Sequence, residues 1–118
     1  MTDQKTTILE LKEMVKEFVD EREWNQYHNT KNLSMAIAIE SSELMEELLW
    51  ESSEAVAATL EKKRENIENE AADILFALLA LCNTCDINLA KAFARKIEIN
   101  RKKYPIDQFK GKSLKYNQ

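Results

Sequence analysis

The stretch that decides the fold is ENEAADILFALLALC, residues 68–82, near the middle of the 118-residue chain. From residue 71 onward it is apolar nearly all round, and a helix of that kind is a central one, covered by several neighbours. Glycine and proline occur once each, at Gly111 and Pro105. Because nothing before residue 105 carries the turn residues of a hairpin-rich fold, the sequence excludes an all-β protein and predicts an all-α one.

Apolar residues at helical spacing predict the neighbours of this central helix. We expect helices over roughly residues 5–22, 33–51, 60–84 and 89–103, the second capped by Asn32 or Ser34 and the fourth stopped by Tyr104-Pro105. Together they predict a four-helix bundle over residues 1–105 with a basic, irregular tail over residues 106–118. Such a short chain gives a thin core for so many apolar side chains, so we expect it to self-associate.

Composition restricts the class of protein. With 44% hydrophobic and 32% charged residues, the chain is expected to be soluble and globular. Its 17 basic and 21 acidic residues give a net charge of −4, which argues against binding to duplex nucleic acid. The sequence has no apolar run long enough to span a membrane and no secretory signal at its start, so we expect no membrane partner and a cytoplasmic location. Cys82 and Cys85 are interpreted as core thiols.

Two acidic pairs carry the chemical signal. Glu40 and Glu43 lie one helical turn apart on the second predicted helix, and Glu70 and Asp73 lie one turn apart on the central helix. A single such pair means little in a chain with 21 acidic residues. Here, however, both pairs border the apolar stripe of their helix, so both are predicted to face the interior.

Four inward carboxylates repel one another and lose hydration, which costs several kcal/mol per ion unless a cation compensates. All-oxygen ligation suits Mg²⁺, with Mn²⁺ as a substitute, and both ions also take phosphate oxygens as ligands. The sequence therefore predicts a metal site that acts on a phosphorylated substrate. Two alternatives stay open: a non-catalytic oligomeric interaction module, and a phosphohydrolase with a different phosphorylated substrate.

Four ordered blocks of the chain resemble the all-α nucleoside triphosphate pyrophosphohydrolases of the MazG-like superfamily, most closely the dCTP pyrophosphatase branch. The blocks are EREWNQYHNTKNL (21–33), IESSELMEELLW (39–50), ENEAADILFALLAL (68–81) and KIEINRKKYP (96–105). Ile39 and Ala77 depart from the family pattern, the latter where the dCTP-specific branch often has an aromatic residue. The base preference is therefore left open.

The resemblance implies hydrolysis of a (deoxy)nucleoside triphosphate to the monophosphate and pyrophosphate, with removal of unwanted nucleotides as the biological role. The family's Mg²⁺ ligands match Glu40, Glu43, Glu70 and Asp73, and its members form dimers or dimers of dimers. Glu43 and Glu47 are the candidates to orient or deprotonate the attacking water, because a carboxylate beside a metal-bound water can accept its proton.

The remaining candidates bind substrate. The resemblance places Trp24 and Trp50 at the base pocket, where an aromatic ring can stack on a nucleobase. His28 could hydrogen-bond the base or ribose, or serve as a local cap. Near the end of the fourth predicted helix, polar residues on or beside one face are candidates to hold the triphosphate, although a basic helix end also complements the helix dipole. They are Lys96, Asn100, Arg101 and Tyr104, with Lys112, Lys115 and Tyr116 of the tail as weaker additions.

Overall fold

The computed structural model describes residues 1–113. Every secondary-structure element among those residues is a helix, and none is a strand. The elements in chain order are α1 (Ile8–Glu21), the 3₁₀ turn η1 (Trp24–Tyr27), α2 (Thr30–Glu46), α3 (Val56–Lys62), α4 (Arg64–Cys85), α5 (Leu89–Lys103) and α6 (Ile106–Phe109). The predicted all-α fold is confirmed. The chain divides into two compact units, the first ending at Ile87 and the second beginning at Asn88.

In the first unit, α1 begins at a capping box. The Glu10 amide donates to Thr7 Oγ1 over 3.1 Å, and the Thr7 amide donates to Glu10 Oε2 over 3.0 Å, so each residue satisfies an amide left open at the helix start. Val15 and Val19 are buried on its inner face. After Glu23, which adopts a left-handed conformation (φ 53°), η1 turns the chain towards α2.

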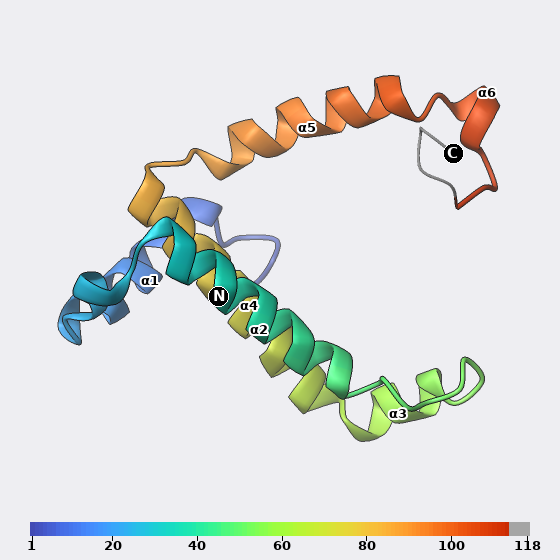
Figure 1. Ribbon diagram of the computed structural model, residues 1–118, viewed down its shortest axis with the longest axis horizontal. Coiled ribbons are helices and arrows are strands. Elements are labelled where there is room, and N and C mark those ends of the chain that lie inside the picture. Colours follow the sequence, from blue (N-terminus) through green and yellow to red (C-terminus); the bar gives the residue numbers. More distant parts are fainter. Residues whose placement is uncertain (114–118) are drawn as a thin grey trace. The chain divides into compact units, whose positions relative to one another are not determined.

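Helices α2 and α4 lie side by side and antiparallel, with the C-terminal end of α2 next to the start of α4 (Figure 1). Helix α2 is capped by Asn29, whose side chain accepts from the Asn32 amide over 2.8 Å. Helix α4 carries the most buried side chains, with Leu79 and Cys82 each 1% exposed. The prediction that residues 68–82 form the central helix is confirmed.

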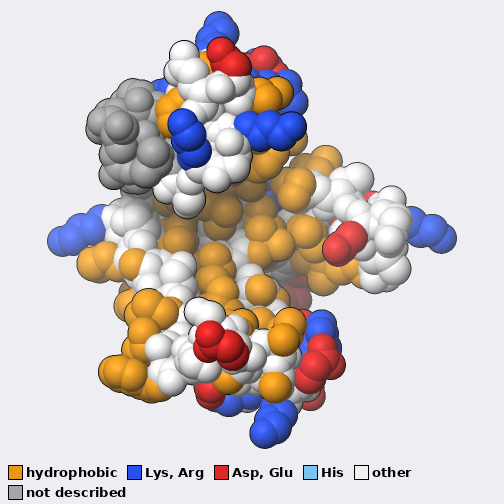
Figure 2. Space-filling view, turned by 90° about the vertical axis from the view of Figure 1, so that its right-hand side faces the viewer, with side chains coloured by type: hydrophobic (Ala, Val, Ile, Leu, Met, Phe, Trp, Pro, Cys, Tyr) orange, Lys and Arg blue, Asp and Glu red, His pale blue; other side chains and the backbone are white. Residues whose placement is uncertain are grey.

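The core is small, as expected. Many large hydrophobic side chains reach the surface of the described residues (Figure 2). They include Met35, Ile39, Met45 and Leu49, which are all exposed along α2 and the turn that follows it.

Several predicted boundaries were wrong. The helix expected over residues 60–84 is two helices, because the chain turns at Lys63 between α3 and α4. Helix α2 starts at Thr30 and is capped by Asn29, not by Asn32 or Ser34, and it ends at Glu46. Residues 106–109 of the tail form the short helix α6, so that part of the tail is not irregular.

In the second unit, Asn88 caps α5 by accepting from the Lys91 amide over 3.1 Å. Pro105 ends that helix, as predicted, and leads into α6. The rings of Tyr104 and Phe109 meet edge to face with their centroids 5.1 Å apart, which fastens α6 to the end of α5. Among the described residues, no single helix is both long and apolar enough to cross a membrane; α4 and α5 reach that length and composition only as a broken pair.

Candidate metal centre and nucleotide site

The acidic residues of α2 and α4 form a cluster where the two helices pack together. Oxygen atoms from the carboxylates of Glu40, Glu43 and Glu70 lie within 4.8 Å of one another. Glu40 and Glu43 are one turn apart on α2, and the antiparallel packing brings Glu70 of α4 opposite them. We call these three residues the carboxylate cluster.

Two carboxylates of the cluster, those of Glu40 and Glu70, have raised pKa values and no hydrogen-bond donor among the described residues for one buried oxygen atom each. Burial raises the pKa of Glu40, and the hydrogen bond and charge of Glu43 raise it further. Burial also raises the pKa of Glu70, followed by the charges of Glu43 and Asp73. Oε2 of Glu40 and Oε2 of Glu70 are both buried and have no hydrogen-bond partner in the part of the chain that the structure describes. Buried carboxylate oxygens are costly without a donor or a cation, so this arrangement fits a metal ion.

Asp73 stands next to the cluster on α4, one turn after Glu70. Its charge raises the pKa of both Glu40 and Glu70, which places it within electrostatic reach of the three grouped carboxylates. The structure thus brings three of the four predicted metal ligands, Glu40, Glu43 and Glu70, into one cluster, whereas the Asp73 side chain, one turn further along α4, is exposed. All-oxygen donors of this kind favour Mg²⁺ or Mn²⁺.

Glu47, the other candidate for activating water, has a different partner. Its Oε2 lies 3.4 Å from Nζ of Lys63, at the turn between α3 and α4. The same ammonium donates to the Glu47 backbone carbonyl over 3.3 Å. Glu43 therefore lies within the cluster, whereas Glu47 is engaged by a lysine beside it.

A groove of about 630 Å³ opens beside Asp73. Its walls come from α1, η1 and α4, and Asp73 is the one charged residue among those that line it: Leu11, Met14, Val15, Phe18, Trp24, Ala72, Asp73, Leu75, Phe76 and Leu79. The Phe18 ring meets Trp24 and Phe76 edge to face, at centroid distances of 5.6 and 5.4 Å. We call this feature the apolar groove. Asp73, a predicted metal ligand, thus lies beside an aromatic surface.

Comparison with known proteins identifies the relatives of this arrangement. The model of the MazG-like family matches residues 35–118, which include both acidic pairs. The chain belongs to the MazG-like family.

Among curated MazG-like relatives, dCTP pyrophosphatase 1 of Rattus norvegicus is 33% identical over 112 residues, covering 93% of this chain and 66% of its own. The human protein of the same name is 31% identical over 114 residues, covering 95% of this chain and 67% of its own. The chain thus spans about two thirds of the length of these relatives. A crystal structure of a pyrophosphatase from Archaeoglobus fulgidus superposes with a TM-score of 0.80 at 40% identity, covering 89% of this chain and 98% of that one. The predicted resemblance is confirmed.

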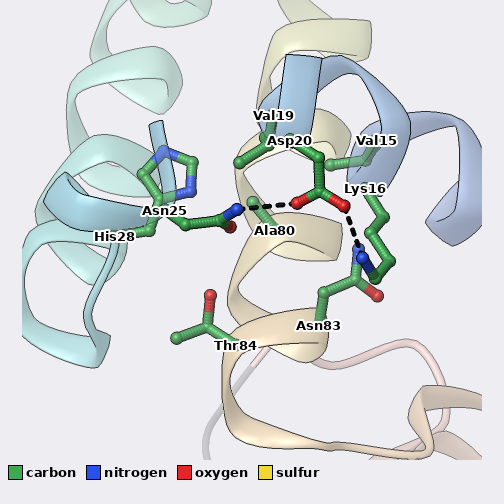
Figure 3. A pocket seen from close by; sticks show the side chains of 9 residues that line it. All are labelled: Val15, Lys16, Val19, Asp20, Asn25, His28, Ala80, Asn83 and Thr84. Atoms are coloured by element: carbon green, nitrogen blue, oxygen red, sulfur yellow. Dashed lines mark hydrogen bonds and ion pairs between the residues drawn. The ribbon is translucent and has the colours of Figure 1, made fainter. Parts of the chain in front are cut away.

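His28 lies in a different pocket of this MazG-like chain. That pocket, of about 260 Å³, is lined by Val15, Lys16, Val19, Asp20, Asn25, His28, Ala80, Asn83 and Thr84 (Figure 3). Asn25 donates to Asp20 over 2.7 Å and Lys16 pairs with the other oxygen of the same carboxylate, and these two contacts lower the pKa of Asp20. Because Ala80 is two turns of α4 beyond Asp73, the structure does not bring His28 to the carboxylate cluster.

The two tryptophans have different surroundings. Trp24 is 41% exposed and lines the apolar groove, in contact with Phe18. Trp50 is 90% exposed in the turn that follows α2. A large aromatic ring this exposed contributes little to the core of its own chain, so it is available to contact a ligand or another chain.

The predicted triphosphate contacts lie in the second unit. Lys96 and Arg101 are exposed on α5, while Asn100 and Tyr104 are half-buried. Arg101 pairs with Glu98, and Tyr104 packs on Phe109. Their role in binding phosphate stays a prediction. Lys112 is exposed, and Lys115 and Tyr116 lie outside the described residues.

Sequence reasoning missed Lys63 and the apolar groove. Lys63 precedes Glu70 by seven residues, two helical turns, so the helix predicted over residues 60–84 already placed both residues on one face. The groove depends on how α1 crosses α4, and no local pattern specifies that crossing.

Proposed function

We propose that this chain hydrolyses (deoxy)nucleoside triphosphates to the monophosphate and pyrophosphate in the presence of Mg²⁺, with Mn²⁺ as a substitute. The observation that carries the proposal is the pair of buried carboxylate oxygens, Oε2 of Glu40 and Oε2 of Glu70, which have no hydrogen-bond partner among residues 1–113. The similarity of the chain to dCTP pyrophosphatase 1 and to an archaeal pyrophosphatase supports the same chemistry.

Glu40, Glu43, Glu70 and Asp73 would hold the cation. When bound, a divalent cation neutralises charge on the phosphates and lowers the pKa of a coordinated water. Glu43 is the better placed of the two water-activating candidates, because its carboxylate lies within the cluster while that of Glu47 pairs with Lys63. The role of Glu43 is to accept a proton from the water that attacks the α-phosphorus, in line with the departing pyrophosphate.

The apolar groove would take the nucleobase. It borders Asp73, so a base in the groove lies beside the carboxylates that would hold the cation and the phosphates. The Trp24 ring offers a stacking surface at the groove wall, and Trp50 offers another on the exposed turn. Cytosine deoxynucleotides are the proposed preference, after the names of the relatives. Removal of unwanted nucleotides from the cytoplasmic pool is the proposed role.

Self-association is part of the proposal. Several large hydrophobic side chains of α2 and of the turn that follows it are exposed in the single chain, and a second copy of the chain would cover them. A homodimer or homotetramer is expected by light scattering of the purified protein.

The test is incubation with a panel of deoxynucleoside and ribonucleoside triphosphates, with Mg²⁺ or with a chelator, followed by identification of the products. Monophosphate and pyrophosphate, formed only with the metal, support the proposal. Orthophosphate would indicate a different phosphohydrolase. No product from any triphosphate would favour the non-catalytic interaction module.

A further inference from the structure

Lys63 stands at the turn between α3 and α4, and both helices hold its backbone. Its amide donates to the Thr59 carbonyl of α3 over 2.9 Å, and its carbonyl accepts from the Ile67 amide of α4 over 2.9 Å. Thr59 is itself buried. The position of Lys63 is therefore fixed by its neighbours on both sides, although the helix end there carries no side-chain cap.

The Lys63 side chain makes two contacts with the end of α2. Its ammonium lies 3.4 Å from Oε2 of Glu47 and donates to the Glu47 carbonyl over 3.3 Å. Glu47 is the C-cap of α2, and backbone carbonyls at a helix C-terminus lack helical partners. The Glu47 side chain is 19% exposed and that of Lys63 is 43% exposed, so the carboxylate is sheltered while the ammonium remains partly in solvent.

The helical register puts this pair in line with the carboxylate cluster. Glu47 follows Glu40 by seven residues on α2, and Lys63 precedes Glu70 by seven residues along α4. Seven residues are two turns, about 10 Å along a helix axis. Because α2 and α4 run antiparallel (Figure 1), the Lys63 contact with Glu47 lies about two turns from the carboxylate cluster along the line where these helices pack. The charge of Glu47 reaches Glu70, whose pKa it raises.

We infer that Lys63 is a built-in counter-cation of the site, which keeps Glu47 out of the metal's ligand set and lowers the affinity of the nucleotide-free protein for Mg²⁺. The inference rests on the proposed function, because it concerns the metal that hydrolysis would require. Lys63 is a positioning residue here, acting through Glu47 and through its own charge.

The consequence concerns how the cation is held. If Glu47 were added to the four proposed ligands, the site would bind a divalent ion more strongly without any substrate. With Glu47 neutralised by Lys63, a larger share of the ligation falls to the phosphate oxygens of the nucleotide, as is usual for Mg²⁺ sites. Metal and triphosphate are then expected to bind cooperatively.

The experiment is calorimetric titration of the nucleotide-free protein with Mg²⁺, comparing charge variants at the seam. Lys63→Met should tighten Mg²⁺ binding about tenfold, the order expected for a unit charge lost near a divalent ion in a partly hydrated site. Glu47→Gln should weaken binding by a similar factor, because it leaves the lysine charge unopposed. The double variant K63M/E47Q should return close to the wild-type affinity.

Lys62→Met is the matched control, since it removes the same charge one residue earlier, on an exposed side chain at the end of α3. It should change the affinity less than twofold. Unchanged or weaker binding in K63M, or an equal effect of K62M, would overturn the inference. If K63M fails to fold, the sign of the E47Q effect decides: tighter or unchanged binding overturns it.

The controls separate this inference from the proposed function. If the wild-type protein binds no Mg²⁺ and releases no pyrophosphate, the proposed function itself fails. If the wild-type protein binds Mg²⁺ and turns over while the seam variants bind it equally well, only the role of Lys63 fails.

Discussion

Replacement of Glu40 by Gln should stabilise the metal-free protein while removing its response to metal. The glutamine side chain would keep nearly the same shape and lose the negative charge that faces Glu43 and Glu70 within 4.8 Å. At that separation one carboxylate pair costs about 1 to 2 kcal/mol with an effective dielectric constant between about 40 and 80. Because Glu40 is half-buried, solvent screening reduces the sum for both pairs to about 1 to 2 kcal/mol.

For a chain of this length, about 1 kcal/mol corresponds to about 4 °C in Tm. The E40Q variant should therefore melt about 4 to 8 °C higher than the wild type in the presence of a chelator. Mg²⁺ at a hundred times its Kd should stabilise the wild type by about 2.7 kcal/mol, or about 10 °C, and E40Q by less than about 2 °C.

The assay is thermal unfolding followed by circular dichroism, with chelator and over a Mg²⁺ series. Glu46→Gln is the control, because Glu46 is an exposed residue of the same helix outside the cluster. It should leave both the metal-free Tm and the Mg²⁺ response unchanged. A metal-free E40Q protein that melts below the wild type, or that keeps the full Mg²⁺ response, would refute the electrostatic reasoning.

Three further predictions concern pH, the acidic pair on α4 and the exposed tryptophan. The pKa values of Glu40 and Glu70 are raised in the folded state, so the stability that these two groups contribute without metal is present below the ordinary carboxyl pKa and is lost as the pH rises through the raised values. The difference in Tm between E40Q and the wild type should therefore grow from about pH 4 to about pH 8. A difference that stays constant with pH would count against these shifts. Asp73→Asn should abolish turnover with an unchanged circular dichroism spectrum, whereas wild-type activity retained by the variant at saturating Mg²⁺ would count against Asp73 as a ligand. Trp50→Ala should leave stability within about 0.5 kcal/mol of the wild type and raise KM about 5- to 100-fold if the ring stacks on the base; an unchanged KM would remove Trp50 from the nucleotide site.

The sequence predicts the main helices and the meeting of the two acidic pairs because both depend on helical periodicity, which is a local property. Residues 74–82 are all apolar, and the helix that contains them is the central one. Glu40 and Glu70 are half-buried beside the apolar stripe of their helices, whereas Asp73 is exposed, contrary to the prediction that both pairs face the interior. Packing α2 against α4 was then sufficient to bring Glu43 and Glu70 together.

What the sequence did not predict depends on weak or non-local signals. Helix α3 is rich in alanine, a residue that favours helices, but its sequence shows no apolar face that would mark it as a separate helix. Neither glycine nor proline marks the break between α3 and α4 at Lys63. The apolar groove and the pocket of His28 are formed by different stretches of α4 against α1 and η1. Their separation depends on the packing of three elements and could not be read from spacing.

The most direct measurement for the central claim is a crystal structure of the protein soaked in Mn²⁺, with the ion located by its anomalous scattering. We predict a peak between the carboxylates of Glu40, Glu43, Glu70 and Asp73, and its disappearance in the Asp73→Asn variant. A structure in which these side chains bind no ion at millimolar Mn²⁺, while the same preparation still releases pyrophosphate, would contradict the account.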